Sequence, residues 1–385
     1  MIRKSNFVLI FLILTLMVFG ASAFAQEEPV KMGIVCEITG GGAAHGTMWR
    51  DGILMAVDEI NEAGGILGRE VEVFTLDTQT RPPVSIAAMK RAVGKDPFAV
   101  FGTIYSSSTI ANMNILENAG IPQIVGSTST AIYEKESSNI FSTSPINRDA
   151  FKPVTRWMVE EFEPSKLAMV YTNDEMGADG WDKVSKYLEG NSEVDLKGIA
   201  VTNGQSDFAG ELERIKNFDA DLIFLYGHEE ENAKFLNQMK SLGMDTQVVG
   251  YSTLVNAQTI ELAGEAINGV QGVSTWSTKY GPIKNFVEKF KLRYGEEPTH
   301  DAVKGYVGFY TVKAAIEAVG EFDRTKVKKF LHENPITTEM EPNVYMDLRY
   351  RDDGTVDREL FLIGVENQEQ KLVKLIPPEK PEAFD

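Results

Sequence analysis

The sequence predicts an α/β protein built of two Rossmann-like lobes, each formed around a sheet of mainly parallel strands. Short apolar runs alternate with amphipathic stretches along most of the chain, which is the pattern of repeated strand–helix units. Some runs, such as Leu222–Tyr226, are apolar at every position, as strands covered by helices on both faces require. The chain has 385 residues, whereas a single domain usually holds roughly 100–150. We therefore expect two lobes.

The first half contains the clearest strand–helix–strand unit. Strands are expected at 31–38 and 71–76, and between them Trp49 and Ile53 begin an apolar repeat at helical spacing that Gly64 ends. Further strands are expected at 98–101, 121–125, 167–171, 194–201, 222–226 and 248–250. Helices are expected near 177–189, 207–217, 230–242, 283–294 and 301–319.

The N-terminus has the features of a secretory signal peptide. Arg3 and Lys4 precede the apolar run 7–19, and small residues lead to a cleavage site after Ala25. The run is shorter than the roughly 20 apolar residues that a spanning helix needs. We expect residues 1–25 to be removed and the mature chain to be a soluble protein of the periplasm, without insertion into the membrane.

Charge and cysteine content exclude several kinds of protein. The formal net charge is −18, and losing the two basic residues of the signal segment makes the mature chain more negative. Such a surface repels nucleic acid and anionic lipid. Cys36 is the only cysteine, so no intrachain disulfide can form, and its apolar neighbours predict a buried thiol.

Two hydroxyl-rich loops follow neighbouring predicted strands. Strand 98–104 leads into 105–109 (YSSST), and strand 121–125 leads into 126–130 (GSTST). Ligands of open parallel sheets bind at the carboxyl ends of the strands, where hydroxyls and free N–H groups at helix N-termini suit a carboxylate. Ser and Thr also cap helices and fill turns without any ligand. Two such loops in succession favour a carboxylate site.

Several segments carry a resemblance to a known family. They are 31–35 (KMGIV), Thr39-Gly40, Gly46, Gly52, Ala56-Val57, 60–69 (INEAGGILGR), Asp77, Gly102 with 106–109 (SSST), 120–122 (GIP), Asn173-Asp174 with Gly177, Tyr294-Gly295, Pro298 and Gly305-Tyr306. The N-x-x-G-G-I-x-G pattern within 60–69 is the most distinctive. Together they span the predicted mature chain, which resembles the type I periplasmic binding proteins. The nearest group is the leucine/isoleucine/valine-binding protein family, the capture subunits of ABC importers.

The resemblance implies a hinge of three chain segments between the lobes. They are expected near 144–148, 273–277 and 341–346. The implied first lobe is 29–146 with 276–341, the second is 147–275 with 342–376, and 377–385 forms a flexible tail. A small solute, a branched-chain or other amino acid or a related small carboxylate, would be captured by hinge closure. The protein, expected as a monomer, would then deliver it to a membrane ABC permease.

The resemblance also implies ligand-binding residues. Ser106 and Thr130 match the positions that hold a ligand carboxylate, with Ser129 adding backbone contacts. The positions that cover the ligand match His45, Met176 and His228, and the acidic position that pairs with the ligand ammonium matches Ser252. Because a buried ammonium without an anionic partner is costly, either Glu229, Glu230 or Glu175 supplies the charge or the ligand has no α-amino group. Hydroxy or keto acids, aromatic carboxylates, amides and urea-like solutes then fit.

Other functions match the sequence less well. The cluster Gly40-Gly41-Gly42 is placed like a dinucleotide loop, but His45 stands where the third glycine of G-x-G-x-x-G belongs, so we expect neither an enzyme nor a cofactor. A soluble ligand sensor of the same fold is the alternative. His228 before three glutamates hints at a metal site, yet no compact His/Cys spacing occurs and acidic helix starts are common. No metal is expected.

Overall fold

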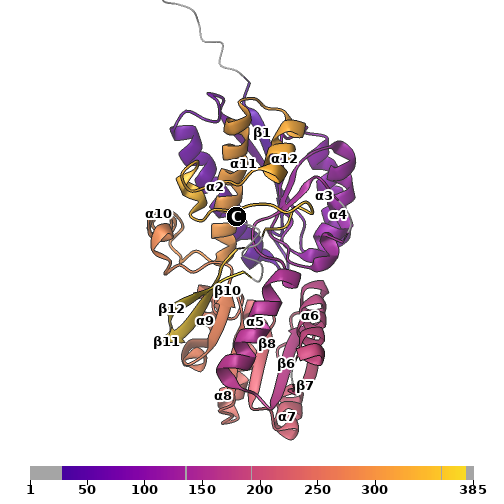
Figure 1. The fold of residues 1–385 in the computed structure, drawn as a ribbon, viewed down its shortest axis with the longest axis vertical. Helices are drawn as coiled ribbons and strands as arrows, with labels where there is room; N and C mark the ends of the chain where they lie inside the picture. Colours follow the sequence, from indigo (N-terminus) through magenta and orange to yellow (C-terminus); the bar gives the residue numbers. More distant parts are fainter. Residues whose placement is uncertain (1–27, 135–136, 192, 357, 379–385) are drawn as a thin grey trace, which may run out of the picture.

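The computed structural model describes residues 28–134, 137–191, 193–356 and 358–378 (Figure 1). The predicted signal peptide and almost all of the predicted tail lie outside these residues. Two lobes, each with its own sheet, lie one above the other in Figure 1. The predicted α/β class with two parallel-rich sheets is confirmed.

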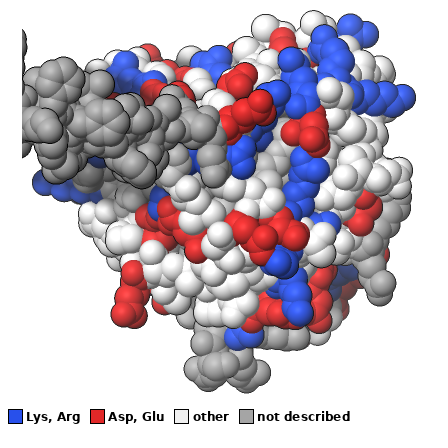
Figure 2. All heavy atoms as spheres, turned by 90° about the horizontal axis from the view of Figure 1, so that it is seen from above, with Lys and Arg blue, Asp and Glu red and all other residues white. Residues whose placement is uncertain are grey.

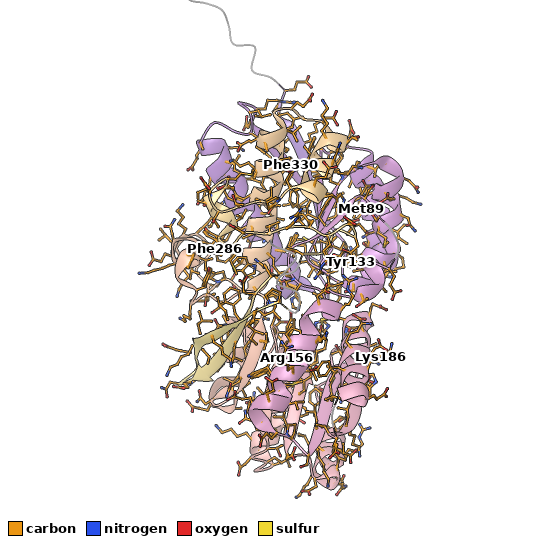
Figure 3. The ribbon with its side chains drawn as sticks, viewed as in Figure 1. Met89, Tyr133, Arg156, Lys186, Phe286 and Phe330 are labelled. Carbon is orange, nitrogen blue, oxygen red and sulfur yellow. The ribbon has the colours of Figure 1, made fainter. Side chains whose placement is uncertain are left out.

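The first lobe is built on a five-stranded sheet in the order β2-β1-β3-β4-β5, and every pair in it is parallel. Its strands are β1 (Val30–Cys36), β2 (Val71–Asp77), β3 (Val100–Phe101), β4 (Gln123–Val125) and β5 (Ile140–Ser142). Its helices are α2 (Ala43–Glu62), α3 (Pro82–Val93), α4 (Ser106–Ala119), α10 (Lys284–Tyr294), α11 (His300–Val319) and α12 (Arg324–Glu333). Figure 3 shows Met89 of α3 and Phe330 of α12 in this lobe.

Two glycines let α11 pack closely on α2, although the helices are far apart in the sequence. A Cβ atom added at Gly52 would lie 2.0 Å from the carbonyl oxygen of Ala302. One added at Gly305 would lie 2.4 Å from the carbonyl oxygen of Trp49. Both distances are shorter than any contact that a Cβ atom makes in a real structure. Glycine at these positions therefore sets how closely α11, with the residues at its N-terminus, packs on α2.

The second lobe has a seven-stranded sheet in the order β12-β11-β10-β9-β8-β6-β7. Its strands are β6 (Lys166–Thr172), β7 (Asp195–Val201), β8 (Leu222–Tyr226), β9 (Gln247–Tyr251), β10 (Gln271–Ser274), β11 (Leu360–Glu366) and β12 (Glu369–Ile376). Its helices are α5 (Asn147–Phe162), α6 (Glu175–Asn191), α7 (Ala209–Phe218), α8 (Glu229–Ser241) and α9 (Ala257–Ala263). Arg156 of α5 and Lys186 of α6 mark this lobe in Figure 3. Among the described strands of this sheet, the antiparallel pairs are β10–β11 and the edge hairpin β11–β12.

The apolar strands are buried as the sequence predicts. All five residues of β8 are buried, because the strand lies in the interior of the sheet with helices on both faces (Figure 1). Cys36 is also fully buried, and burial raises the pKa of its thiol well above the usual range. It is therefore held as an unreactive thiol.

The third connection between the lobes lies later in the chain than the expected hinge segment 341–346. The backbone N–H of Ser142 donates to the carbonyl of Gly354 (2.9 Å), and that of Val356 donates to Ser142 Oγ (2.8 Å). This stretch therefore lies against β5 of the first lobe, and the chain passes to β11 between Val356 and Leu360. Gly354 has a φ of +79°, and a Cβ atom there would lie 1.8 Å from the carbonyl oxygen of Ile140. A glycine turn thus keeps this stretch on the first lobe.

Arg358 joins the three segments of the hinge. Its side chain is buried, and its Nη2 donates to the carbonyl of Thr143 at 3.2 Å and approaches that of Thr275 at 3.5 Å. Its guanidinium carbon lies 4.1 Å from the ring centre of Trp276. Thr143 follows β5 and Thr275 follows β10, so one cation contacts all three connections between the lobes.

The surface carries charges of both signs. Figure 2 looks down on the first lobe and shows Lys and Arg side chains interspersed with Asp and Glu. Of the helices in the described part of the chain, none is both long enough and apolar enough to cross a bilayer.

Candidate solute site between the lobes

One pocket lies where the two lobes meet. Residues that follow β3, β4, β6, β8, β9 and β10 line it, together with the N-terminal turns of α2 and α11. Carboxyl ends of parallel strands and helix N-termini from both lobes therefore face the same space, which is the usual ligand position of open α/β sheets. Its walls include the aromatic rings of Tyr105, Tyr226 and Tyr251.

The two hydroxyl-rich loops lie side by side because β3 and β4 are parallel neighbours. The backbone N–H of Ser129 donates to Ser106 Oγ at 3.2 Å, and Ser127 Oγ donates to the carbonyl of Thr103 at 3.0 Å. Ser106, the first residue of α4, lines the pocket. Its oxygen already accepts a bond, so its own hydroxyl proton is available for a ligand.

Ser129 and Thr130 lie beside the pocket and bond to the second lobe. Ser129 Oγ donates to Glu175 Oε1 at 2.9 Å. Thr130 donates to Asp179 Oδ2 through its backbone N–H (2.9 Å) and its hydroxyl (3.1 Å). Both carboxylates belong to the first turns of α6. In this arrangement, Asp179 occupies the Thr130 hydroxyl that was expected to hold a ligand carboxylate, and Glu175 occupies the hydroxyl of Ser129, from which backbone contacts were expected.

His45 bridges the lobes. It lies in the first turn of α2, and its Nδ1 is 2.7 Å from Asp301 Oδ2 of the first lobe. Its Nε2 is 2.8 Å from Glu229 Oε2 of the second lobe. Burial opposes a charge on the imidazole, but the two carboxylates outweigh it and raise the pKa of His45 well above its usual value. Asp301 also accepts a hydrogen bond from Lys304 Nζ at 2.8 Å.

His228 precedes α8 and lies next to His45 on the pocket wall. Its Nε2 is 2.7 Å from Asp174 Oδ2. Although burial favours the protonated acid, the bond to His228 holds the pKa of Asp174 well below its usual value. The His228 ring stacks on Tyr105 with centroids 5.1 Å apart and lies 5.6 Å from the His45 ring. The three rings form one wall.

The structure brings five of the seven expected residues to the pocket wall: His45, Ser106, Met176, His228 and Ser252. Ser252 Oγ accepts the backbone N–H of Thr275 at 3.2 Å. Of the acids considered as ammonium partners, Glu175 lines the pocket. Glu230 instead pairs with Lys234 at an exposed site (3.0 Å), and Glu229 contacts His45 and Asn256 behind the wall.

Several residues of the wall were not predicted from the sequence, including Asp301, Lys304, Tyr251 and Thr275. Asp301 and Lys304 begin α11, whose apolar face predicts a core helix. Two charged residues near the start of α11 were the available signal. They are unusual there because α11 is buried along most of its length. Tyr251 and Thr275 simply end strands, and nothing in their local pattern marks them as site residues.

Comparisons with known proteins agree on the family. The periplasmic binding protein family model matches residues 29–370. A leucine-, isoleucine-, valine-, threonine- and alanine-binding protein of Pseudomonas aeruginosa is 25% identical over 322 residues, which is 83% of this chain and 86% of the relative.

Solved structures share the fold. A leucine-binding protein from Thermotoga maritima superposes with a TM-score of 0.81 at 22% identity, covering 92% of this chain and 100% of that one. A solute-binding protein of an ABC transporter from R. palustris, in complex with benzoate, gives 0.81 at 19% identity, covering 91% and 97%. With the family match over most of its length, the chain belongs to the periplasmic binding proteins.

Proposed function

We propose that this chain is the periplasmic capture subunit of an ABC importer, and that it closes around an amino acid or a related small carboxylate without altering it. The observation that carries the proposal is a set of buried polar atoms on the pocket wall. Tyr251 Oη, Thr275 Oγ1, His228 Nδ1 and His300 Nδ1 have no hydrogen-bond partner among the described residues. Buried polar groups are nearly always paired, so a polar solute is the natural partner.

Charge and shape favour a small carboxylate. The hydroxyl-bearing Ser106 lines the pocket and can donate to a carboxylate, and the basic groups of its wall, Lys304 and His45, are shared with Asp301. The wall formed by Tyr105 and His228 offers a flat apolar surface to the rest of the solute. The similar proteins described above also favour a small carboxylate, since they include an amino-acid-binding protein and a benzoate complex.

Glu175 is the best candidate for pairing with a solute ammonium. Of the carboxylates on the described pocket wall, Asp174 faces His228, and Asp301 faces His45 and Lys304. Glu175 instead accepts a bond from the hydroxyl of Ser129. A hydroxyl leaves the carboxylate charge uncompensated, so Glu175 can turn to an ammonium group at lower cost than the other two.

The test is a thermal-shift screen of the protein from Gln26 onward against amino acids, hydroxy and keto acids, aromatic acids, amides and urea. A solute at about 100 times its Kd raises the free energy of unfolding by about 2.7 kcal/mol. A positive solute should also compact the protein in small-angle scattering, because the second lobe swings onto the first. If no solute shifts the melting temperature, or if the best one leaves the scattering unchanged, the proposal fails.

Two variants then separate the solute classes. Glu175→Gln should weaken α-amino acids and leave acids without an amine nearly unaffected, whereas the exposed Glu230→Gln, a matched control, should change neither. Recovery of the unaltered solute from the denatured complex distinguishes binding from catalysis. Conversion of the solute during incubation would contradict the capture role.

A further inference from the structure

Two histidines of the pocket wall and a glutamate behind it bring metal-binding atoms together. One such atom from each of His45, His228 and Glu229 lies within 4.8 Å of the other two. The residues are 7%, 8% and 4% exposed, so the cluster is shielded from bulk water. His45 comes from the first lobe, and the other two come from the turn that begins α8.

Each histidine is oriented by a carboxylate on its other ring nitrogen. Asp301 Oδ2 lies 2.7 Å from Nδ1 of His45, and Asp174 Oδ2 lies 2.7 Å from Nε2 of His228. This carboxylate–histidine arrangement is the usual support of metal-binding imidazoles, because it fixes the ring and its tautomer. The ring nitrogens that these two carboxylates do not bind are Nε2 of His45 and Nδ1 of His228.

Only one of these two remaining nitrogens has no partner in the described protein. His228 Nδ1 is buried without a hydrogen-bond partner. His45 Nε2 instead pairs with Glu229 Oε2 at 2.8 Å. A protonated His45 held between Asp301 and Glu229 accounts for the second contact, but it leaves the His228 nitrogen unexplained.

We infer that His45 Nε2, His228 Nδ1 and one oxygen of Glu229 bind a divalent transition-metal ion of the zinc class. Two imidazoles and a carboxylate suit such ions better than Mg²⁺ or Ca²⁺, which prefer oxygen ligands. Bonds of about 2.0–2.2 Å place tetrahedral ligand atoms roughly 3.3–3.6 Å apart, so His45 Nε2 and Glu229 Oε2, which lie 2.8 Å apart, must separate to admit the ion. The proton of His45 Nε2 is released to solvent as the metal–nitrogen bond forms.

Three protein ligands leave a fourth position open to the pocket. An oxygen or nitrogen atom of a solute can occupy it, as water and substrate do at zinc sites with three protein ligands. The inference rests on the proposed function in one respect: the ligands come from both lobes, so the ion binds the closed state and holds it closed. A solute that chelates the ion would bind more tightly with metal than without it.

The experiment uses tag-free protein from Gln26 onward, stripped with chelator and titrated with Zn²⁺ in competition with a chromophoric chelator. We expect one ion per chain, and at least a tenfold weaker affinity in His45→Asn and in His228→Asn. Asp174→Asn, which removes the carboxylate that supports His228 but keeps an acceptor for the backbone N–H of Gly177, should weaken binding by about 10–100-fold. His332→Asn is the matched control, since this histidine contacts the carbonyls of Ser138 and Arg351. Cobalt substitution should give the absorption of a tetrahedral site in the native protein and the control alone.

Absence of stoichiometric binding, or equal affinity in native protein and His228→Asn when both unfold at similar temperatures, would overturn the inference. The solute screen is repeated on the stripped protein to keep the two proposals apart. Solute shifts without zinc binding would refute the metal site and leave solute capture standing. Zinc binding without any solute response would refute solute capture and leave the metal site standing.

Discussion

Glu37 offers the sharpest test of the energetics near the site. It directly follows β1, is fully buried, and accepts the backbone N–H of Ile104 at 3.2 Å, next to the hydroxyl-rich loop. Burial raises its pKa from 4.5 to about 7, against the opposing effect of the backbone hydrogen bonds. Because the folded state binds the proton more tightly than the unfolded chain does, this group favours folding below about pH 4.5 and opposes it increasingly as the pH rises through 7.

The expected change in the free energy of unfolding follows from the difference between the pKa of Glu37 in the folded protein and that in the unfolded chain. At about 1.4 kcal/mol per pKa unit, ionised Glu37 lowers the free energy of unfolding by about 3 kcal/mol at pH 8. Glu37→Gln keeps the shape and the acceptor for Ile104 but cannot ionise. It should therefore stabilise the protein at pH 8 by about 1–3 kcal/mol and change little at pH 5. Urea unfolding of both proteins at the two pH values measures this directly. An equal difference at pH 5 and pH 8 would refute the reasoning.

Three further predictions concern the site and its support. Ser106→Ala should weaken solute binding by about 1–3 kcal/mol in calorimetry with unchanged urea unfolding; unchanged affinity would remove Ser106 from the site. Thr130→Val should weaken binding about as much as Asp179→Asn if Thr130 acts through lobe closure, and more if it touches the solute, which makes the comparison of their affinities decisive. Gly52→Ala should lower the free energy of unfolding by about 1–3 kcal/mol, because the new methyl group meets the backbone of Ala302; an unchanged melting temperature would contradict this packing.

The sequence predicts those features that depend on local pattern. The fully apolar run Leu222–Tyr226 becomes an interior strand, and the loops at 105–109 and 126–130 meet because consecutive parallel strands are neighbours. The same reasoning gives Ser106 a place on the pocket wall. In each case the information lies within one strand–helix unit.

Other features depend on contacts between distant segments and could not be predicted. The ion contact of His45 with Glu229 joins helices from different lobes, so no spacing in the chain reveals it. Ser129 lies in a hydroxyl-rich loop of the kind that binds ligands, but its hydroxyl donates to Glu175 of α6 instead. The late third segment of the hinge depends on the turn at Gly354, whose role is visible only against the carbonyl of Ile140.

In the lobe closure proposed above, the position of Arg358 would restrict how the two lobes move. One side chain touches all three connections, so a buried cation would lie at the pivot. A planar guanidinium can slide across the indole of Trp276 while its bond to the Thr143 carbonyl persists, but it cannot follow a wide separation without leaving a charge buried and unpaired. In that proposal the largest solute that can enter would depend on these contacts as well as on the pocket.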